Sequence, residues 1–393
     1  MTIPAIRLRS RHDRRVREGH PWVFANELDA DVSGLPRGGA VDVLDAAGRF
    51  LGRGYANPAS LITVRLLARA PVDVDDPAWW AERLSRAVER RARALPGRRS
   101  LRLVHAEGDD LPGLVIDRYG DVVVAQLGTL GLQVRKEAIG QAIREVLGPV
   151  AAVVRSEGPA RQLEGLPDEV GPWFGDPPAE VEIEENGVRF VVPVLDGQKT
   201  GHFYDQADNR RFAGERCSGL DVLDLYANGG AWGLYALRGG ARSVLAVDRS
   251  ADCAERIAVN AERNGVSDRL EVARDDGKRA LERLVAEGRR FGAVVLDPPA
   301  FAKARKAAGA ALRGYEDVNA LGLKLVAPGG WLFTSSCSWH VQEDRFVEAV
   351  AAASRKVGRA IRIVRRGEQA PDHPVLPAVP ETRYLKSLAI LVD

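Results

Sequence analysis

Five apolar runs in the second half of the chain each end in an acidic residue or a cysteine, and this alternation limits the possible folds most. The runs begin near residues 222, 243, 270, 291 and 330, and their ends carry Asp224, Asp248, Asp276, Asp297 and Cys337. Stretches long enough for helices separate them, so the pattern predicts a mostly parallel, doubly wound sheet. Such sheets bind ligands at the carboxyl ends of their strands. We therefore expect these five side chains along one edge.

The first strand ends favour a nucleoside cofactor. A turn with Gly229 and Gly230 follows the first strand, and glycine lets a backbone approach a ligand closely because it has no Cβ. The turn lacks the G-x-G-x-x-G fingerprint of dinucleotide sites. Asp248 ends the next strand, at the spacing where a carboxylate accepts ribose hydroxyls. Asp276 and the backbone N–H of Gly277 follow the third strand and are expected to read an adenine edge.

The fourth strand ends in a rigid acidic motif. Asp297 is followed by Pro298 and Pro299, and proline fixes φ and removes a backbone donor. The Asp297 carboxylate is therefore held stiffly and suits an amino-bearing base edge. Phe301 follows, and an aromatic ring at this position can stack on a base; a ring packed into the core is the alternative.

The fifth strand ends in Cys337, between small hydroxyl residues. C5 of a pyrimidine is a poor nucleophile, but addition of a thiolate at C6 makes C5 electron-rich enough to take a methyl group. We interpret Cys337 as that nucleophile. Cys217 precedes the first of these strands and Cys253 is expected in a helix, and we expect both to be structural. The three cysteines have no metal-ligand spacing, so no metal site is predicted.

The totals favour a cytoplasmic protein of two or three domains. The chain has 393 residues, a formal net charge of +2 and three cysteines. We see neither a signal peptide nor an apolar run long enough to span a membrane. Basic residues cluster near the N-terminus, where they suit a phosphate backbone, at Arg7, Arg9, Arg11, Arg14, Arg15 and Arg17.

Motifs along the whole chain resemble one family, the bacterial PUA-domain-containing class I methyltransferases that make 5-methylcytosine in large-subunit ribosomal RNA. The motifs are Gly19–Glu27, Gly54–Pro58, Glu107–Gly120, Gly197–Gln206, Asp297–Pro299, Ser336–Ser338, Asp372–Pro374 and Tyr384–Lys386. The resemblance implies a PUA-like β-barrel for RNA binding at residues 1–72, a central α+β domain at 73–190 and a Rossmann-like class I methyltransferase domain at 191–393. It also implies S-adenosylmethionine (SAM) as the methyl donor, with Cys337 as the nucleophile.

These arguments together lead to a set of expected site residues. Catalysis is assigned to Cys337 and Asp297. The expected cofactor contacts are Tyr204, Gln206, Asp224, Tyr226, Gly229, Gly230, Asp248, Arg249, Asp276, Gly277 and Asp297. The expected substrate contacts are Lys199, Pro298, Pro299 and Phe301. The expected partner is ribosomal RNA of the large subunit or its assembly intermediate, with a homodimer as a further possibility.

Two departures from the family pattern leave alternatives open. Ala207 stands where the family usually has arginine, so that contact is lost or moved to Arg210 or Arg211. Ala300 stands where many RNA cytosine-C5 enzymes carry a second cysteine that helps release the first.

Two alternative functions stay open beside cytosine-C5 methylation. One is an exocyclic-amine methyltransferase, which uses an Asp-Pro-Pro-x-Phe motif without a thiol. Another is a non-catalytic RNA-binding assembly factor.

Overall fold

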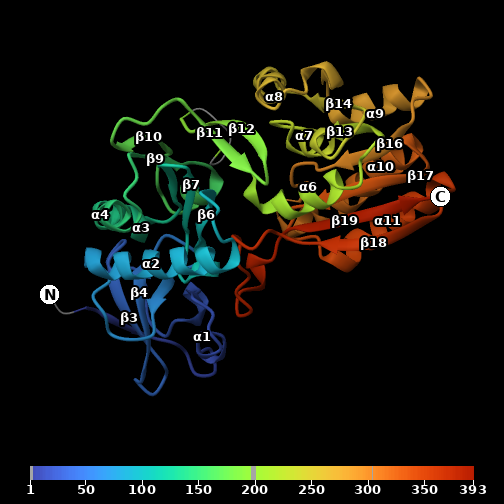
Figure 1. Cartoon of the computed structure of the whole chain (residues 1–393). Coiled ribbons are helices and arrows are strands. Elements are labelled where there is room, and N and C mark those ends of the chain that lie inside the picture. Colours follow the sequence, from blue (N-terminus) through green and yellow to red (C-terminus); the bar gives the residue numbers. More distant parts are fainter. Residues whose placement is uncertain (1–2, 196–200, 303) are drawn as a thin grey trace. The chain divides into compact units, whose positions relative to one another are not determined.

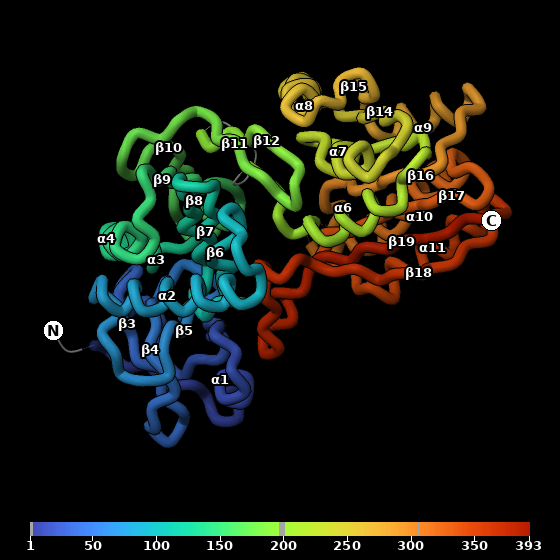
Figure 2. The backbone as a smooth tube through the Cα atoms, viewed as in Figure 1, coloured from blue at the N-terminus to red at the C-terminus, as the bar shows by residue number. Residues whose placement is uncertain are grey.

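The computed structural model describes residues 3–195, 201–302 and 304–393, and its path is shown in Figure 1 and, as a tube, in Figure 2. The chain divides into two compact units. The first unit comprises Met1–Ile183, Val192–Tyr204 and Pro371–Thr382. The second unit comprises Glu184–Val191, Asp205–Ala370 and Arg383–Asp393. The chain therefore passes between the units more than once.

A five-stranded sheet forms the N-terminal part of the first unit. Its strands, in spatial order, are β1 (Ala5–Arg7), β3 (Ala40–Leu44), β4 (Phe50–Ala56), β5 (Val64–Ala68) and β2 (Trp22–Val23), with helix α1 at Arg14–Arg17 and a 3₁₀ turn, η1, at Ala25–Glu27. Alternate side chains of β3 are buried, as the period of a half-buried strand requires. The strands enclose a separate apolar core that includes Val41, Val43 and Leu66.

A second five-stranded sheet forms the central part of the first unit. Its strands are β10 (Glu169–Phe174), β9 (Ala151–Ser156), β8 (Val122–Leu127), β7 (Leu114–Tyr119) and β6 (Ser100–His105). Its helices are α2 (Pro77–Ala94), α3 (Leu130–Val134), α4 (Lys136–Leu147), α5 (Pro159–Leu163) and the 3₁₀ turn η2 (Ala106–Asp109). Helix α2 begins where the Asp76 side chain accepts the Ala78 N–H and proline occupies the first turn. The mixed helices and strands match the α+β architecture expected here.

The two sheets of the first unit share buried contacts. Tyr55 of β4 is fully buried and belongs to the core of the central sheet. Its hydroxyl donates to the Pro112 carbonyl at 2.8 Å and bonds the Thr129 hydroxyl at 2.8 Å. The residues expected as two domains, 1–72 and 73–190, therefore lie largely in one compact unit. The expected three-domain division itself stays a prediction.

A seven-stranded sheet forms the second unit. Its spatial order is β15 (Leu270–Arg274), β14 (Ser243–Asp248), β13 (Asp221–Leu225), β16 (Phe291–Leu296), β17 (Val326–Ser336), β19 (Lys386–Val392) and β18 (Ile361–Gly367). The first five strands are parallel, and β19 is antiparallel to both of its neighbours. The predicted doubly wound, mostly parallel sheet is thus confirmed.

Helices alternate with these strands along the sequence. They are α6 (Ala207–Gly214), α7 (Ala231–Arg238), α8 (Ala251–Arg263), α9 (Gly277–Ala286), α10 (Ala308–Leu325) and α11 (Glu343–Val357), with 3₁₀ turns η3 (Tyr204–Gln206), η4 (Ser267–Arg269), η5 (Arg305–Ala307) and η6 (Pro380–Thr382). A hairpin of β11 (Glu180–Glu185) and β12 (Val188–Pro193) contains points where the chain passes from one unit to the other. Apolar residues of β13, β16 and β19, among them Leu223, Val294 and Ile390, share one core with α9, α10 and α11.

Candidate active site

The strand ends expected to form the site do lie at one edge of the second unit's sheet. Strands β13, β14, β15, β16 and β17 run in the same direction and pair in register, with Leu225 opposite both Val247 and Leu296. Their carboxyl ends therefore share an edge, which carries Asp224, Asp248, Asp276, Asp297 and Cys337. This is the position where open α/β sheets bind their ligands.

Asp224, near the end of β13, has a structural contact with the following helix. The residue is fully buried, and its Oδ2 accepts the Gly233 N–H at 2.9 Å in the first turn of α7. Burial raises the pKa of Asp224 to about 7. The carboxylate thus fixes the start of α7. Its predicted contact with the cofactor stays a prediction.

The turn between β13 and α7 has an unusual backbone, with positive φ at three positions. Tyr226 and Asn228 have φ of 62° and 51°, and Gly230 has φ of 76° immediately before α7. A Cβ added at Gly230 would lie 3.1 Å from a side-chain carbon of Ile257 in α8. The Asn260 side chain of α8 also donates to the Gly229 carbonyl at 2.9 Å. Helix α8 therefore holds the turn in place.

Asp248, at the end of β14, is partly exposed and accepts hydrogen bonds from two backbone N–H groups. Its Oδ2 accepts the Asn228 N–H at 2.9 Å, and its Oδ1 accepts the Ser250 N–H at 3.0 Å. A carboxylate oxygen has more than one lone-pair site, so Asp248 can accept further hydrogen bonds from outside. Arg249 beside it is exposed. The geometry suits a carboxylate that binds hydroxyl groups.

Asp276 begins α9. Its Oδ1 accepts the N–H groups of Lys278 and Arg279 at 3.1 and 3.2 Å, and the residue is exposed. The buried Gly277 lies against Tyr226, because a Cβ added there would fall 2.4 Å from the tyrosine ring. Burial raises the pKa of Tyr226 to about 12. Three residues expected at the cofactor thus meet at the ends of β13 and β15.

Two donors hold the carboxylate of Asp297, which follows β16. Trp232 Nε1 of α7 donates to Oδ2 at 3.0 Å, and Gln206 Nε2 lies 3.1 Å from both carboxylate oxygens. Asn209 in turn donates to Gln206 Oε1 at 2.7 Å. Burial raises the pKa of Asp297 to about 6, while these donors act in the opposite direction. We call Gln206, Trp232 and Asp297 the Asp297 clamp.

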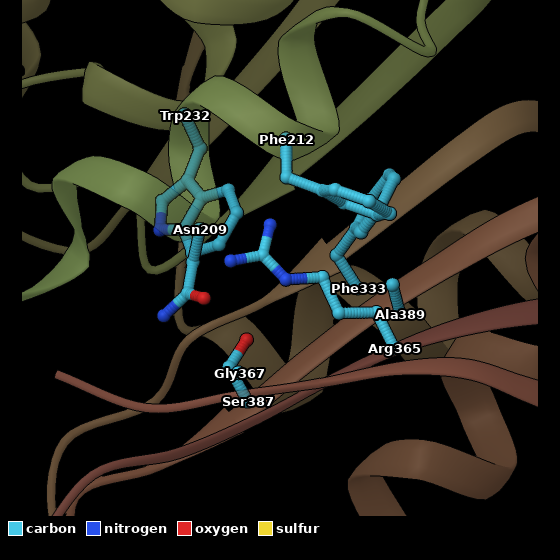
Figure 3. Close-up of a pocket in the computed structure, with 8 residues that line it drawn as sticks. All are labelled: Asn209, Phe212, Trp232, Phe333, Arg365, Gly367, Ser387 and Ala389. Atoms are coloured by element: carbon cyan, nitrogen blue, oxygen red, sulfur yellow. The ribbon is translucent and has the colours of Figure 1, made fainter. Parts of the chain in front are cut away.

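A small pocket lies behind the clamp. Figure 3 shows Trp232 and Asn209 lining it together with Phe212 and Arg365, and its volume is about 10 Å³. That is room for about one water molecule. The Arg365 guanidinium also lies 4.4 Å from the centre of the Phe212 ring. Trp232 of the clamp therefore lines a pocket that is far too small to hold a nucleoside.

The residues around the Asp-Pro-Pro motif have different surroundings. Pro298 is buried and Pro299 is exposed. The half-buried Phe301 packs its ring 4.6 Å from that of Tyr315 in α10, centre to centre. This packing matches the alternative of a core ring, and the stacking of Phe301 on a base stays a prediction. Ala300, which follows the prolines, is partly exposed.

Two expected site residues come in the sequence just before Asp205, where the chain returns to the second unit. Tyr204 is buried in the first unit, where its hydroxyl donates to the Arg118 carbonyl at 3.0 Å. Lys199 lies outside the described residues. Their predicted contacts with cofactor and substrate therefore stay predictions.

Cys337 lies at the end of β17 in a tightly held segment. Ser336 on one side donates to the Tyr315 hydroxyl at 2.9 Å, and Ser338 on the other bonds the same hydroxyl at 3.0 Å. The ammonium of Lys386 in β19 donates to the Ser338 carbonyl at 2.7 Å. Cys337 itself is partly exposed, whereas Cys217 is buried. A partly accessible thiol on a fixed backbone is what a nucleophile needs.

Sequence reasoning missed several residues of this site. It assigned no role to Trp232 or Asn209, and it included Lys386 only within a motif of the resemblance. The lost family arginine is not replaced in a simple way: Arg210 is buried and pairs with Glu185 at 2.9 Å, and Arg211 is exposed. The sequence around Trp232 and Asn209 carries no signal of their long-range contacts, because those partners lie far away along the chain.

No helix among the residues that the structure describes is both long and apolar enough to cross a membrane.

Two family models match the chain. One, described as a PUA-like domain, matches residues 6–69, and the other, described as an S-adenosylmethionine-dependent methyltransferase, matches residues 102–389.

Curated relatives match along the whole chain. "Ribosomal RNA large subunit methyltransferase I" of Shewanella amazonensis is 38% identical over 392 residues, covering 98% of this chain and 99% of its own. The protein of the same name from Vibrio cholerae is 36% identical over 398 residues, covering 99% of each.

Solved structures share the fold. A methyltransferase complexed with SAH matches with a TM-score of 0.85 and 19% identity over all of both chains. A SAM-dependent methyltransferase from Streptococcus mutans matches with a TM-score of 0.84 and 19% identity, covering 99% of this chain and 100% of that one. At this identity the similarity establishes the fold alone.

Proposed function

The chain belongs to the family of SAM-dependent methyltransferases that contains the bacterial ribosomal RNA large subunit methyltransferases I, and we propose that it methylates C5 of a cytosine in large-subunit ribosomal RNA. The observation that carries the proposal is the placement of Cys337 and Asp297 at the ends of the neighbouring strands β17 and β16. A thiol nucleophile has no task in methylation of an exocyclic amine, whereas C5 chemistry requires one.

The residues present fit SAM as the cofactor. In the proposal, Asp248 accepts the ribose hydroxyls with the lone pairs that its bonds to Asn228 and Ser250 leave available. The Gly229–Gly230 turn, which has no Cβ, lets the backbone approach the ligand. Asp276 and Gly277, next to Tyr226, read the adenine edge. When bound, SAM supplies the methyl group.

The chemistry of the proposal is carried by Cys337 and Asp297. The Cys337 thiolate adds to C6, which makes C5 the nucleophilic carbon of the ring. After C5 has taken the methyl group, its proton passes to water or another base, the C5–C6 double bond re-forms, and the thiolate leaves C6. The Asp297 carboxylate accepts a hydrogen bond from the amino group at N4 and so orients the ring. The Asp297 clamp keeps that carboxylate fixed before the base arrives, which avoids reorganisation during the reaction.

Binding of the RNA is assigned to the N-terminal sheet. Residues 6–69 match the PUA-like domain, and the arginines between residues 7 and 17 provide positive charge for phosphates. A ribosomal RNA substrate also agrees with the cytoplasmic location expected from the cysteine content. The comparisons give no support to the homodimer that was left as a possibility, and the proposal concerns one chain.

A covalent trap tests this function. An RNA substrate with 5-fluorocytosine at the target should form a lasting adduct in the presence of SAM, because fluorine cannot leave as a cation and elimination stalls. We expect the wild type and Cys253→Ser to be trapped and Cys337→Ala to be inert while still binding SAM. Near-normal methylation by Cys337→Ala would contradict the proposal and move the assignment to an exocyclic amine.

A further inference from the structure

We propose that Lys386 is a positioning residue that takes the proton of the Cys337 thiol and holds the sulfur as a thiolate. The inference rests on the proposed function, because it assumes that Cys337 is the nucleophile. It adds a residue from the antiparallel strand of the sheet to a site otherwise built from the parallel strands and their helices.

The strand register and one hydrogen bond bring Lys386 to the segment that contains the cysteine. Strand β19 pairs antiparallel with β17, and Lys386 lies opposite Ser336, the residue immediately before Cys337. Lys386 is 6% exposed, and lysine is almost never buried unless its charge has partners. Its Nζ donates to the Ser338 carbonyl at 2.7 Å and to the Tyr384 carbonyl at 2.8 Å. The ammonium is therefore fixed on the strand that ends in Cys337.

These two bonds leave one position on Nζ. A neutral amine that donates both of its hydrogens has one lone pair left, and an ammonium in the same place has one further N–H. Both carbonyls accept in either state, so neither bond has to break when a proton arrives. Nζ can consequently take a proton without moving.

The surrounding charges favour this exchange. Burial lowers the pKa of Lys386 to about 8, and the charge of Cys337 acts against that effect by favouring the ammonium. Arg383 disfavours the ammonium and the weaker effect of Glu343 favours it, and these two side chains form an ion pair at 2.9 Å. On the α10 side, the neutral hydroxyl of Tyr315 bonds Ser336 and Ser338, the neighbours of Cys337, and the pKa of Tyr315 is raised first by burial and also by the charge of Cys337.

The proton transfer is balanced. The S–H bond of Cys337 breaks and its electron pair stays on sulfur, while a third N–H bond forms on Nζ of Lys386. The two groups become a thiolate and an ammonium together, so the net charge of the site does not change. An ion pair of this kind is the usual means by which a cysteine pKa falls below its ordinary value of about 8.5.

The test measures the ionisation of the thiol itself. The full-length protein is alkylated with iodoacetamide from pH 5.5 to pH 10, and mass spectrometry follows the rate at each cysteine separately. We expect Cys337 to titrate at least about one unit below the ordinary value of about 8.5. In Lys386→Met the midpoint should rise by at least about one unit, and in Lys386→Arg, which keeps the charge, it should stay below the Lys386→Met value.

Internal controls separate this effect from a loss of structure. Cys253, which is partly exposed in α8, should keep the same alkylation profile in all three proteins. SAM affinity by calorimetry should also be unchanged, because Lys386 is not among the proposed cofactor contacts. A Cys337 midpoint at or above the ordinary value in the wild type, or one that Lys386→Met leaves unchanged, overturns the inference.

The inference and the proposed function fail separately. Alkylation requires neither RNA nor SAM, so it reports on the pair of Lys386 and Cys337 alone. An alkylation midpoint of Cys337 that is low and depends on Lys386, without a fluorocytosine adduct, would support the pair and refute the C5 chemistry. An adduct that forms with a thiol insensitive to Lys386 would support the chemistry and refute the pair.

Discussion

Replacing Gln206 by leucine tests the Asp297 clamp. The side-chain amide of Gln206 donates to both carboxylate oxygens of Asp297, whose pKa is about 6. A hydrogen bond to a charged group contributes roughly 1.5–3 kcal/mol, and one pKa unit corresponds to about 1.4 kcal/mol. Loss of this donor should therefore raise the pKa of Asp297 by about one to two units, to about 7–8.

The sign of the effect follows from the form that the proposal requires. Asp297 acts as a carboxylate, so activity is lost as the pH falls through its pKa. At pH 7 a group of pKa about 6 is about nine-tenths ionised, while one of pKa about 7–8 is between about half and one-tenth ionised. Methylation by Gln206→Leu at pH 7 should consequently fall about two- to tenfold, and it should recover almost fully at pH 9.

The assay is the pH dependence of kcat/KM for RNA at saturating SAM. Activity falls on the acidic side of each pH profile, and we call this part of the profile its acid limb. Ionisation of Cys337 is common to all variants, so a difference in the pH midpoint of the acid limb between variants reports on Asp297. Trp232→Phe removes the other clamp donor and should shift the limb in the same direction. Gln141→Leu, an exposed substitution on α4, serves as the matched control and should not shift it. An equal loss of activity by Gln206→Leu at every pH, or an unshifted limb, would refute the reasoning.

Two further predictions concern the ligands. Asp248→Ala should weaken SAM binding several-fold or more in calorimetry, since one hydrogen bond contributes about 0.5–1.5 kcal/mol and ribose offers two hydroxyls; unchanged affinity would remove Asp248 from the cofactor site. The double change of Arg7 and Arg11, both exposed, to glutamine should weaken RNA binding and reduce the slope of log K against log[salt] by about 1.4–1.8 for two lost phosphate contacts. Filter binding at several salt concentrations measures this, and an unchanged slope would place the RNA elsewhere.

The sequence was sufficient for the parallel part of the sheet and not for its other edge. Strands β14 and β16 are nearly continuous, buried apolar runs, as expected where helices cover both faces of a doubly wound sheet. No prediction covered β18 and β19. The chain between them includes Pro371–Thr382, which belongs to the first unit. Nothing local in Lys386–Val392 indicates that it returns to pair with both β17 and β18.

The same limit applies to the site. The acids at strand ends are visible in the sequence because the direction of the strands decides where they lie. Their partners are not visible, because they depend on contacts between distant segments. Gln206 is 91 residues from Asp297, Trp232 is 65 residues from it, and Lys386 is 48 residues from Ser338. Gln206 itself was expected at the cofactor, and in the structure its amide contacts Asp297.

In the proposed function, the adjacency of β16 and β17 lets an aspartate and a cysteine act on one ring. Neighbouring strands lie about 4.8 Å apart, and Leu296 and Thr334, near the two strand ends, are register partners. A cytosine between the ends could present N4 to Asp297 and C6 to Cys337, because the hydrogen bond to N4 lies in the plane of the ring and the thiolate approaches C6 from its face. Each group is then fixed by a different part of the fold: Asp297 by Trp232 of α7 and by Gln206, and the segment around Cys337 by α10 and β19.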